Sequence, residues 1–272
     1  MTMSDRRPIH DPSEPVGDDG SQKPSCLVLH GLGGGRYELE PVIAALEAEG
    51  LRVLAPVLPG HDGPGPVMPA SCWRDWAATA ESGFDELAAG GGPVVVVGFS
   101  TGGTLALYLA SRRPVARQVL LAPFLAIRYS RLIPLRSATY LGFLSRFKPD
   151  LPRRAPAVRD PEMRRWAAGS DRFRTFNVNA ALSALDLIEA VKSLVPQITI
   201  PTLIIQGKRD TVVEPRSASE LYQSLGSTQK SLVMLPRSDH LLALDRDRER
   251  VIAMTRDFVL ARKDLSTHAE AD

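Results

Sequence analysis

Short apolar runs alternate along the chain with longer segments in which apolar residues recur every three or four positions. The short runs are typical of buried β-strands, and the spaced segments are typical of amphipathic helices. Because strands that alternate with helices form βαβ units, the sequence predicts an α/β fold with a mostly parallel central sheet and helices on both faces. Strands are expected at Cys26–Leu29, Val53–Ala55, Val94–Val97, Val119–Leu121, Leu203–Ile205 and Leu232–Met234.

The helical segments each carry an apolar face. One helix is expected over residues 37–49, where Gly50 stops it, and another begins at a predicted N-cap, Ser71, and continues to about Leu87. The remaining helices are expected at about 101–112, 182–194 and 217–225, with a last one around 251–259.

The alternation breaks between about Phe124 and Ala181. This stretch of 58 residues is too long for a plain loop in a compact domain, so we expect an inserted cap at 124–181. The flanking parts, 24–123 and 182–262, are expected to form the core. The polar ends of the chain are expected to be disordered tails, at 1–23 and 263–272.

The composition is that of an ordinary globular protein, with 44% hydrophobic and 24% charged residues, which is enough apolar material for a core. No apolar run approaches the ~20 residues that span a bilayer, and the start of the chain lacks the apolar stretch of a secretory signal. The two cysteines, Cys26 and Cys72, indicate neither a disulfide framework nor a metal site. These features favour a reducing, cytoplasmic setting.

The string Gly98-Phe99-Ser100-Thr101-Gly102 fits the pattern G-x-S-x-G and lies where a β-branched strand ends and a helix begins. A nucleophile elbow requires that position. Its turn is strained, so the neighbours of Ser100 must be small, and Gly98 and Gly102 meet that need. At a helix N-terminus, free N–H groups favour developing negative charge. The alternative is a glycine-rich turn without chemistry.

A serine hydroxyl is a weak nucleophile and needs a base. Of the five histidines, His240 directly follows the last expected strand, and the carboxyl end of a parallel sheet is where ligands gather. The alternative for His240 is an exposed loop histidine. Asp210, which follows the strand Leu203–Ile205, is the expected acid that orients the imidazole, with Asp239 and Glu214 as rivals.

A tetrahedral oxyanion needs two backbone N–H donors. The Thr101 N–H, directly after the nucleophile, is one expected donor. The second is expected in the loop after the first strand, His30-Gly31-Leu32-Gly33-Gly34-Gly35, with Leu32 as the donor. The glycines allow this backbone to approach a substrate closely. We expect His30 to hold the loop rather than to react.

These motifs, together with Pro59-Gly60-His61-Asp62 and Ile204-Ile205-Gln206-Gly207-Lys208-Arg209-Asp210, resemble the α/β-hydrolase superfamily and, within it, the bacterial carboxylesterases and monoacylglycerol lipases. The chain order Ser100, Asp210, His240 is that of α/β-hydrolases. The resemblance covers about 24–262 outside the expected cap. It implies the α/β-hydrolase fold and hydrolysis of carboxylic esters through an acyl-enzyme, without cofactor or metal. Because His240 must be neutral, activity is expected to fall below a pH of roughly 6–7.

The expected cap is strongly basic. It holds eleven Arg and one Lys against three Asp and one Glu, a net charge of +8, which leaves 2 − 8 = −6 for the rest of the chain. Between Arg128 and Lys148, basic residues interleave with apolar ones, as in a helix pair that buries one face and solvates its arginines. Adsorption to anionic lipid surfaces is the alternative, and no motif for nucleic acid is present. The apolar residues favour a small-molecule ester with a medium or long acyl chain.

Other functions stay open at this point. The string Gly98 to Gly103 also resembles cofactor-free perhydrolases, and thioester or lactone hydrolysis would use the same site. A different class would be a non-catalytic hydrolase fold that binds a ligand, which the complete set of Ser100, Asp210 and His240 disfavours. A fluorophosphonate probe separates these classes, because it reacts only with an activated serine.

Overall fold

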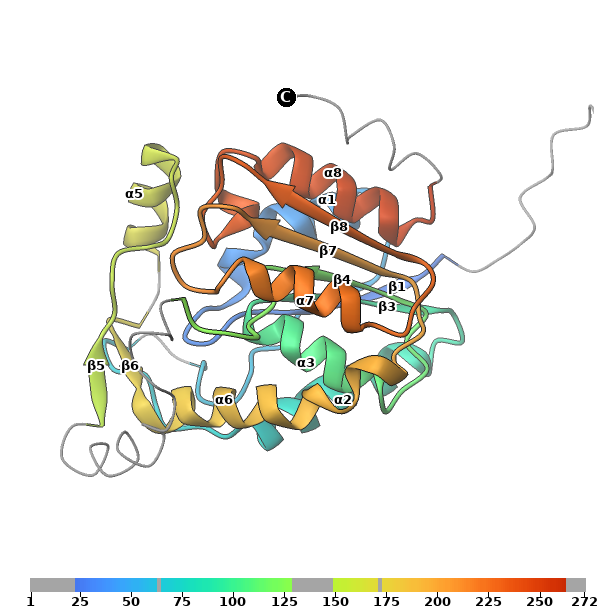
Figure 1. The fold of residues 1–272 in the computed structure, drawn as a ribbon, viewed down its shortest axis with the longest axis horizontal. Coiled ribbons are helices and arrows are strands. Elements are labelled where there is room, and N and C mark those ends of the chain that lie inside the picture. The colour runs from blue at the N-terminus through green and yellow to red at the C-terminus, as the bar shows by residue number, and fades with distance from the viewer. Residues whose placement is uncertain (1–22, 63–64, 129–148, 171–172, 263–272) are drawn as a thin grey trace, which may run out of the picture.

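The computed structural model describes residues 23–62, 65–128, 149–170 and 173–262. Figure 1 shows how their helices and strands are arranged. The predicted tails, apart from Lys23, lie outside the described residues, and so do the interleaved basic and apolar positions of the expected cap that follow Arg128.

A six-stranded sheet forms the centre of the molecule. Its strands lie in the order β2-β1-β3-β4-β7-β8, and every neighbouring pair is parallel. All six expected strands are present, so the predicted α/β fold with a mostly parallel central sheet is confirmed. The strands are β1 (Ser25–Leu29), β2 (Val53–Leu54), β3 (Val94–Phe99), β4 (Arg117–Leu121), β7 (Thr202–Gly207) and β8 (Lys230–Leu235).

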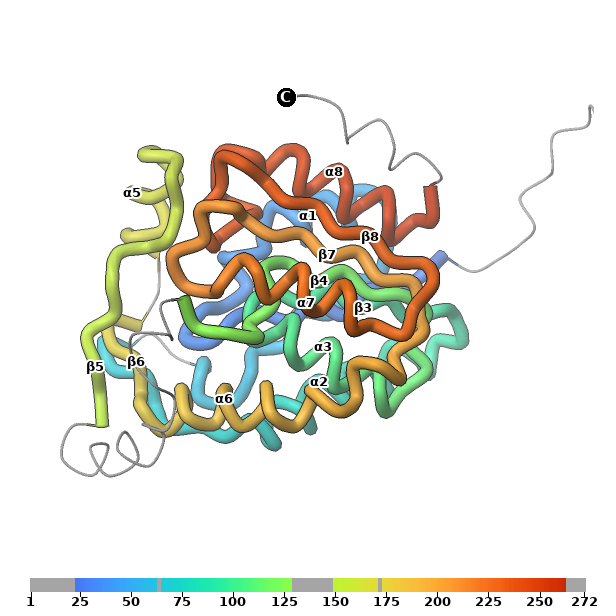
Figure 2. The backbone as a smooth tube through the Cα atoms, in the orientation of Figure 1, coloured from blue at the N-terminus to red at the C-terminus, as the bar shows by residue number. Residues whose placement is uncertain are grey.

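Helices cover both faces of this sheet, as the ribbon and the tube show (Figures 1 and 2). On one face, α1 (Glu40–Ala48) packs against α8 (Arg248–Val259). On the other face, three helices pack together: α2 (Trp73–Ala88), α3 (Thr101–Ala110) and α6 (Val178–Lys192). Further helical elements of the described residues include α7 (Arg216–Ser224), which contacts β7 and β8, and short 3-10 helices at Arg36–Glu38, Val195–Gln197 and Leu242–Leu244.

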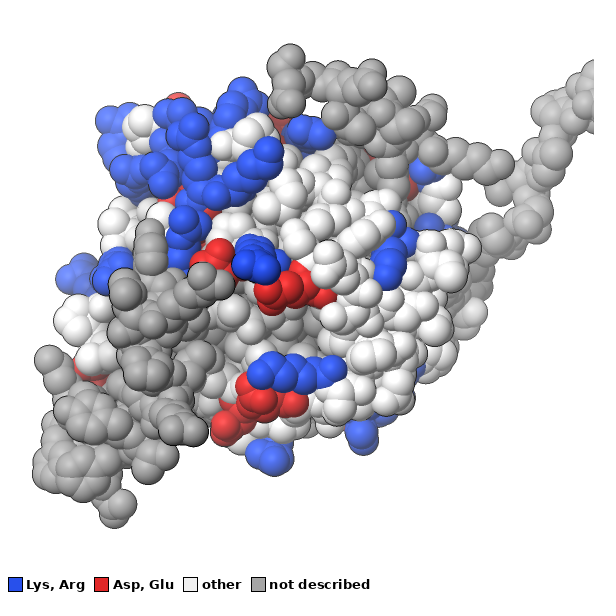
Figure 3. All heavy atoms as spheres, viewed as in Figure 1, with Lys and Arg blue, Asp and Glu red and all other residues white. Residues whose placement is uncertain are grey.

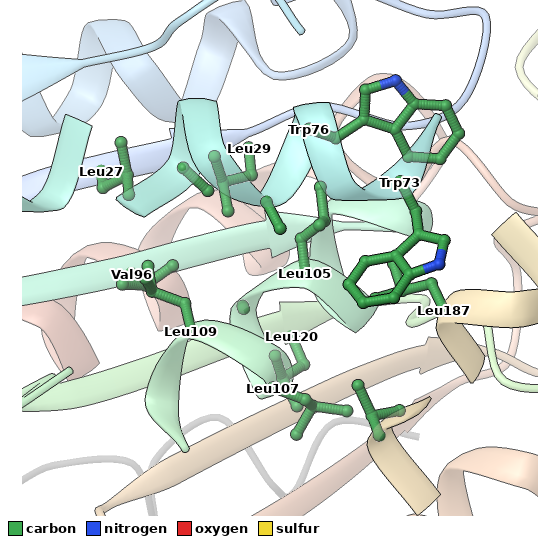
Figure 4. Packing of buried hydrophobic residues seen from close by; sticks show 14 of the residues in the cluster. Leu27, Leu29, Trp73, Trp76, Val96, Leu105, Leu107, Leu109, Leu120 and Leu187 are labelled. Atoms are coloured by element: carbon green, nitrogen blue, oxygen red, sulfur yellow. The ribbon is translucent and has the colours of Figure 1, made fainter. Parts of the chain in front are cut away.

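Alternation of side chains along each strand produces two apolar layers. Leu27 and Leu29 of β1 join the cluster beneath α2, α3 and α6, whereas Cys26 and Val28 join the cluster beneath α1 and α8. Figure 4 shows the first cluster, in which Trp76 is the largest fully buried side chain. Burial on both faces is the reason that these strands read as continuous apolar runs.

Two helix starts differ from the prediction. α2 begins at Trp73 without a cap from Ser71, because the Trp73 N–H donates to the hydroxyl of Ser183 on α6, at 2.7 Å. α6 begins at Val178, before the expected position at 182, because the Asn177 side chain caps its first turn. Both starts therefore depend on partners that a search for helical periodicity does not weigh.

The β4–α6 segment, residues 122–177, has regular structure of its own where it is described. β5 (Asp150–Pro152) and β6 (Thr175–Asn177) form an antiparallel pair, and α5 (Pro161–Gly169) is capped by the Asp160 side chain. The two strands have three residues each, and the buried residue of α5 is Ala167, so none of these elements carries an apolar pattern that would indicate it. Figure 1 shows them on the side toward which the arrows of β7 and β8 point, which is the carboxyl edge of the sheet.

Candidate active site

Ser100 lies at the turn between β3 and α3, and its backbone is in a strained conformation with φ 52° and ψ −119°. Such strain costs on the order of 1–3 kcal/mol and persists only where the surroundings enforce it. A Cβ on Gly98 would collide with the Gly102 backbone, and a Cβ on Gly102 would collide with the Leu29 carbonyl. The two small residues expected beside the serine are therefore required by the space available.

The structure brings Ser100, His240 and Asp210 together. The Ser100 Oγ lies 3.0 Å from His240 Nε2, and His240 Nδ1 lies 2.8 Å from Asp210 Oδ2. With the ring proton on Nδ1, the imidazole donates to the carboxylate and accepts from the serine hydroxyl. The three side chains come from the turns that follow β3, β8 and β7, and all three are buried. Parallel register brings these strand ends to one edge of the sheet.

Asp210 is fully buried, and both of its carboxylate oxygens accept hydrogen bonds. Oδ1 accepts from the Val212 and Val213 N–H groups, each at 2.8 Å, and Oδ2 accepts from Gln206 Nε2 at 2.9 Å as well as from His240. Burial alone raises the pKa of Asp210, but His240 and the two N–H donors outweigh burial and lower that pKa overall. The carboxylate is therefore held ionised beside the imidazole.

The His240 ring is buried. Burial lowers the pKa of its ring, but the charge and hydrogen bond of Asp210, with further contributions from Glu38 and Asp239, raise the pKa above its usual value. The neutral ring, which alone can accept the Ser100 proton, is thus populated at higher pH than in a free histidine. The fall of activity at low pH should accordingly occur at a higher pH than the usual pKa of a histidine would give.

The two rival acids are placed differently. Asp239 directs its Oδ1 to the Thr211 N–H and hydroxyl, at 2.8 and 2.9 Å, and contacts His240 through the backbone N–H. In the part of the chain that the structure describes, Asp210 is the only carboxylate hydrogen-bonded to the imidazole, and Glu214 is not bonded to it. The geometry therefore favours Asp210 as the acid that orients the ring.

The loop Gly31–Gly34 lies against Ser100. A Cβ on Gly31 would lie 3.2 Å from the Ser100 Cβ, so glycine lets this backbone approach the serine. Among the described residues, the N–H groups of Leu32 and Thr101 have no hydrogen-bond acceptor. Thr101 is in the first turn of α3, where N–H groups lack partners within the helix. Both N–H groups are therefore available to an anionic oxygen.

Two buried histidines hold this loop. His30 Nδ1 lies 2.9 Å from the Gly31 carbonyl oxygen, and its Nε2 accepts the Leu58 N–H at 3.1 Å. His61 Nε2 accepts the Gly33 N–H at 2.8 Å. Burial, helped by the neighbouring His61, lowers the pKa of His30 to about 3, and burial also lowers the pKa of His61. Both rings are therefore neutral supports, in agreement with the structural role expected for His30.

The β4–α6 segment is bonded to the loop that carries Asp210 and to the loop that carries His240. Near its start, the Arg128 N–H donates to the Val212 carbonyl at 3.0 Å, and the Arg128 guanidinium donates to the Asp210 carbonyl. The fully buried Asp245, which follows the 3-10 helix Leu242–Leu244, joins a later part of the segment to the His240 loop. Its carboxylate accepts hydrogen bonds of 2.7–2.9 Å from the backbone N–H groups of Arg159, Asp160, Asp239 and Arg246.

Sequence reasoning missed three buried side chains that accept or donate hydrogen bonds at these loops: Glu38, which accepts the Gly31 N–H at 3.3 Å, Gln206 and Asp245. Glu38 carried a signal, because it occupies the apolar stripe of Leu39 and Val42 yet bears a charge, and it is only 3% exposed. Gln206 lies in a motif that resembles the α/β-hydrolases, but neither its role nor that of Asp245 could be predicted, because both roles depend on which loops meet in the folded protein.

Lysine and arginine side chains gather in the region where Figure 1 draws α5, as the space-filling view shows (Figure 3). Arg164 and Arg165 on α5 are exposed, and so are Arg237 and Arg246 near the start of α8. The helices of the described residues include none that is long and apolar enough to cross a membrane.

The six-stranded parallel sheet has helices on both faces, and the strained turn at Ser100 directly follows β3. These features place the protein among the α/β-hydrolases. More narrowly, the chain belongs to the family described as serine aminopeptidase, S33, which matches residues 20–247.

Named relatives agree with this placement. The chain is 27% identical over 260 residues to a thermostable monoacylglycerol lipase of Bacillus sp. (strain H-257), covering 94% of this chain and 98% of the lipase. It is 24% identical over 228 residues to a carboxylesterase of Bacillus subtilis (strain 168), covering 84% and 88%. A solved structure of the metagenome-derived lipolytic enzymes LipS and LipT matches with a TM-score of 0.76 at 25% identity, over 88% of this chain and 94% of that one. The predicted resemblance to bacterial carboxylesterases and monoacylglycerol lipases is confirmed.

Proposed function

We propose that this protein is a serine hydrolase that cleaves carboxylic esters through Ser100, His240 and Asp210. The observation that carries the proposal is the line of contacts from Ser100 Oγ through the His240 ring to the Asp210 carboxylate, at 3.0 and 2.8 Å. Ser100, where these contacts begin, lies in a strained turn. Two N–H groups beside that turn lack acceptors within the described residues. A serine that merely packed against a histidine would need neither feature.

In the proposed reaction, His240 takes the hydroxyl proton as Ser100 Oγ attacks the ester carbonyl carbon. The resulting oxyanion accepts hydrogen bonds from the Leu32 and Thr101 N–H groups. Asp210 stabilises the imidazolium, which then gives its proton to the leaving alcohol as the acyl C–O bond breaks. Water, deprotonated by the same histidine, cleaves the acyl-enzyme and releases the acid and the free serine.

An apolar acyl chain is the proposed group on the acid side of the ester. Leu32, Phe124 and Phe176 are partly buried apolar side chains around the site. The Phe124 N–H donates to the Ser100 carbonyl at 3.0 Å. The Phe176 ring lies against Gly33 in the loop Gly31–Gly34, which we call the oxyanion loop. The relatives named for monoacylglycerols and carboxylic esters support glycerol monoesters among the substrates. We propose that the β4–α6 segment is the cap that shapes this acyl site.

Replacement of the nucleophile tests the proposal. Ser100→Ala should lower the turnover of a nitrophenyl acyl ester by about 10⁶-fold and abolish labelling by a fluorophosphonate, while circular dichroism stays unchanged. A chain-length series of acyl esters and monoacylglycerols on the wild-type protein should then favour medium or long chains over acetyl. Turnover that survives Ser100→Ala would end the assignment.

The family description names an aminopeptidase, which is the principal alternative activity. Recognition of a free amino terminus needs an acid that faces the acyl site. Among the described residues, the acids near Ser100 are engaged within the protein: Asp210, Asp239 and Glu38. Ester cleavage therefore fits the geometry better. Faster hydrolysis of an aminoacyl anilide than of esters would reverse this ranking, and peracid formation from acetate and peroxide would favour the perhydrolase alternative.

A further inference from the structure

A buried acid lies against the oxyanion loop and has no part in the proposed proton transfers. Glu38, in the 3-10 helix before α1, accepts the Gly31 N–H on Oε2 at 3.3 Å, and the Tyr37 hydroxyl donates to Oε1 at 3.5 Å. Its carboxylate packs so closely over Gly34 that any Cβ there would collide with it. The glycine at position 34 and the carboxylate of Glu38 therefore fit one another.

A cation from the β4–α6 segment faces this acid. Arg153 directly follows β5, and its Nη2 lies 3.8 Å from Glu38 Oε1. Its Nη1 donates to the Gly33 carbonyl, and its guanidinium carbon lies 4.9 Å from the centre of the Phe176 ring on β6. The Arg153 side chain is 12% exposed, so most of it is shielded from water. One guanidinium thus contacts both the acid and the oxyanion loop.

These contacts fix the loop on both sides of Leu32. Glu38 holds the N–H of Gly31, which precedes Leu32, and Arg153 holds the carbonyl of Gly33, which follows it. The direction of the Leu32 N–H depends on the orientation of these neighbouring peptide groups. A change at either contact would turn that N–H away from the carbonyl oxygen of the ester that Ser100 attacks.

The charges make each partner dependent on the other. Burial raises the pKa of Glu38, and Arg153, His240 and the Gly31 N–H offset this only in part. An unpaired carboxylate at this position would repel an oxyanion forming at Leu32, and removal of one partner of a buried pair leaves an uncompensated charge. Arg153 supplies the opposite charge, so the acid can hold the loop without opposing the reaction.

We propose that Glu38 and Arg153 are a pair of positioning residues that align the Leu32 N–H, and that the oxyanion site is complete only when the β5–β6 strand pair is docked. The inference rests on the proposed function, because it takes Leu32 as an oxyanion donor. The alignment matters when negative charge develops on the carbonyl oxygen. The pair should therefore act on kcat and leave KM for a neutral ester nearly unchanged.

Arg153→Met, Glu38→Met and the double variant test this pair, with Arg165→Met on α5 as the matched control. kcat and KM for a nitrophenyl ester are measured per active site, counted from the end point of fluorophosphonate labelling. Loss of one whole oxyanion donor lowers kcat by about 10²–10³, so misalignment in either single variant should lower kcat roughly 10- to 100-fold, with KM within about twofold. Arg165→Met should match the wild type.

The double variant and Glu38→Gln sharpen the test. If the residues act as one unit, the double variant should be no slower than the slower single variant. It also leaves no unpaired buried charge, so it covers the case in which Arg153→Met fails to fold. Glu38→Gln keeps an acceptor for the Gly31 N–H and should retain more kcat than Glu38→Met.

Single variants that keep the wild-type kcat, or losses that multiply in the double variant, would overturn the inference and leave ester hydrolysis by the wild type intact. No ester hydrolysis by the wild-type protein would instead overturn the proposed function.

Discussion

The carboxyl edge of the sheet and the β4–α6 segment contribute to the candidate site in different ways. The sheet edge carries the groups proposed to react, in the turns that directly follow β3, β7 and β8. The β4–α6 segment carries supports for those turns. Arg128 donates to the loop that carries Asp210, and Arg153 donates to the oxyanion loop. The Arg159 and Asp160 N–H groups donate to Asp245, beside the loop that carries His240.

The sheet edge places the groups proposed to react, whereas the β4–α6 segment helps to align them. Parallel strand pairing brings the ends of β3, β7 and β8 to one edge, because ladder hydrogen bonds determine the register. Beyond the last ladder bond, a loop must find other partners for its buried polar groups. In the described residues, some of those partners come from nearby residues, such as His30, Glu38 and Gln206, and others come from the β4–α6 segment. Part of the alignment is therefore encoded far in the sequence from the turns that it supports.

The largest effect is expected at the acid on the sheet edge. Asp210→Asn should lower kcat by about 10⁴-fold, because an amide favours the wrong tautomer of His240 and cannot stabilise the imidazolium. Asp239→Asn should lower kcat far less, since its amide oxygen can still accept from the Thr211 and His240 N–H groups. Steady-state kinetics of both variants on one acyl ester compares them. A larger loss at Asp239 would reassign the acid.

A smaller effect is expected where the β4–α6 segment meets the base loop. Asp245→Ala removes the acceptor of several buried backbone N–H groups and should lower the free energy of unfolding by about 2–3 kcal/mol. Asp186→Ala, at an exposed acid on α6, is the control and should change it by less than about 0.5 kcal/mol. Urea unfolding followed by tryptophan fluorescence measures both. Equal losses would show that Asp245 does not anchor the segment.

The smallest effect is expected from titration at the oxyanion loop. The pKa of His30 is about 3 in the folded protein, against roughly 6.5 in an unfolded chain. Because the unfolded chain binds the proton first, the contribution to stability is fully present above pH ~6.5 and is lost as the pH falls toward the folded pKa. By pH 5 the loss is about 2 kcal/mol. His30→Asn should flatten the decline in urea stability between pH 7 and 5, and an unchanged slope would contradict a neutral buried ring.

Most of the sheet could be predicted from the sequence, because strands buried on both faces are continuous apolar runs. The starts of α2 and α6 could not. The first turn of α2 is bonded to Ser183, which lies on a different helix, and α6 takes its cap from Asn177 within β6. Propensity and periodicity describe one segment at a time, so they miss a helix end that depends on another element.

For the same reason, only some residues of the candidate site could be predicted from the sequence. Ser100, Asp210 and His240 could be grouped because each lies directly after a strand, and the structure brings the three together; their catalytic roles remain the proposal. Glu38 and Arg153 could not be paired, because no local pattern relates a residue before α1 to one that follows β5. The one available sign was Glu38 itself, a charged residue in line with the apolar positions Leu39 and Val42.

The contacts of Arg128 and Arg153 pin the chain on both sides of the stretch between them. The Arg128 N–H is bonded to the Val212 carbonyl, and the Arg153 N–H is bonded to the Arg174 carbonyl. Loop closure becomes only about 0.6 kcal/mol less favourable for each doubling of length, so the stretch between these points can be exchanged or resized while its ends stay anchored. In evolution or in engineering, a new specificity can therefore be grafted between these two anchors without rebuilding the turns that carry Ser100, His240 and Asp210.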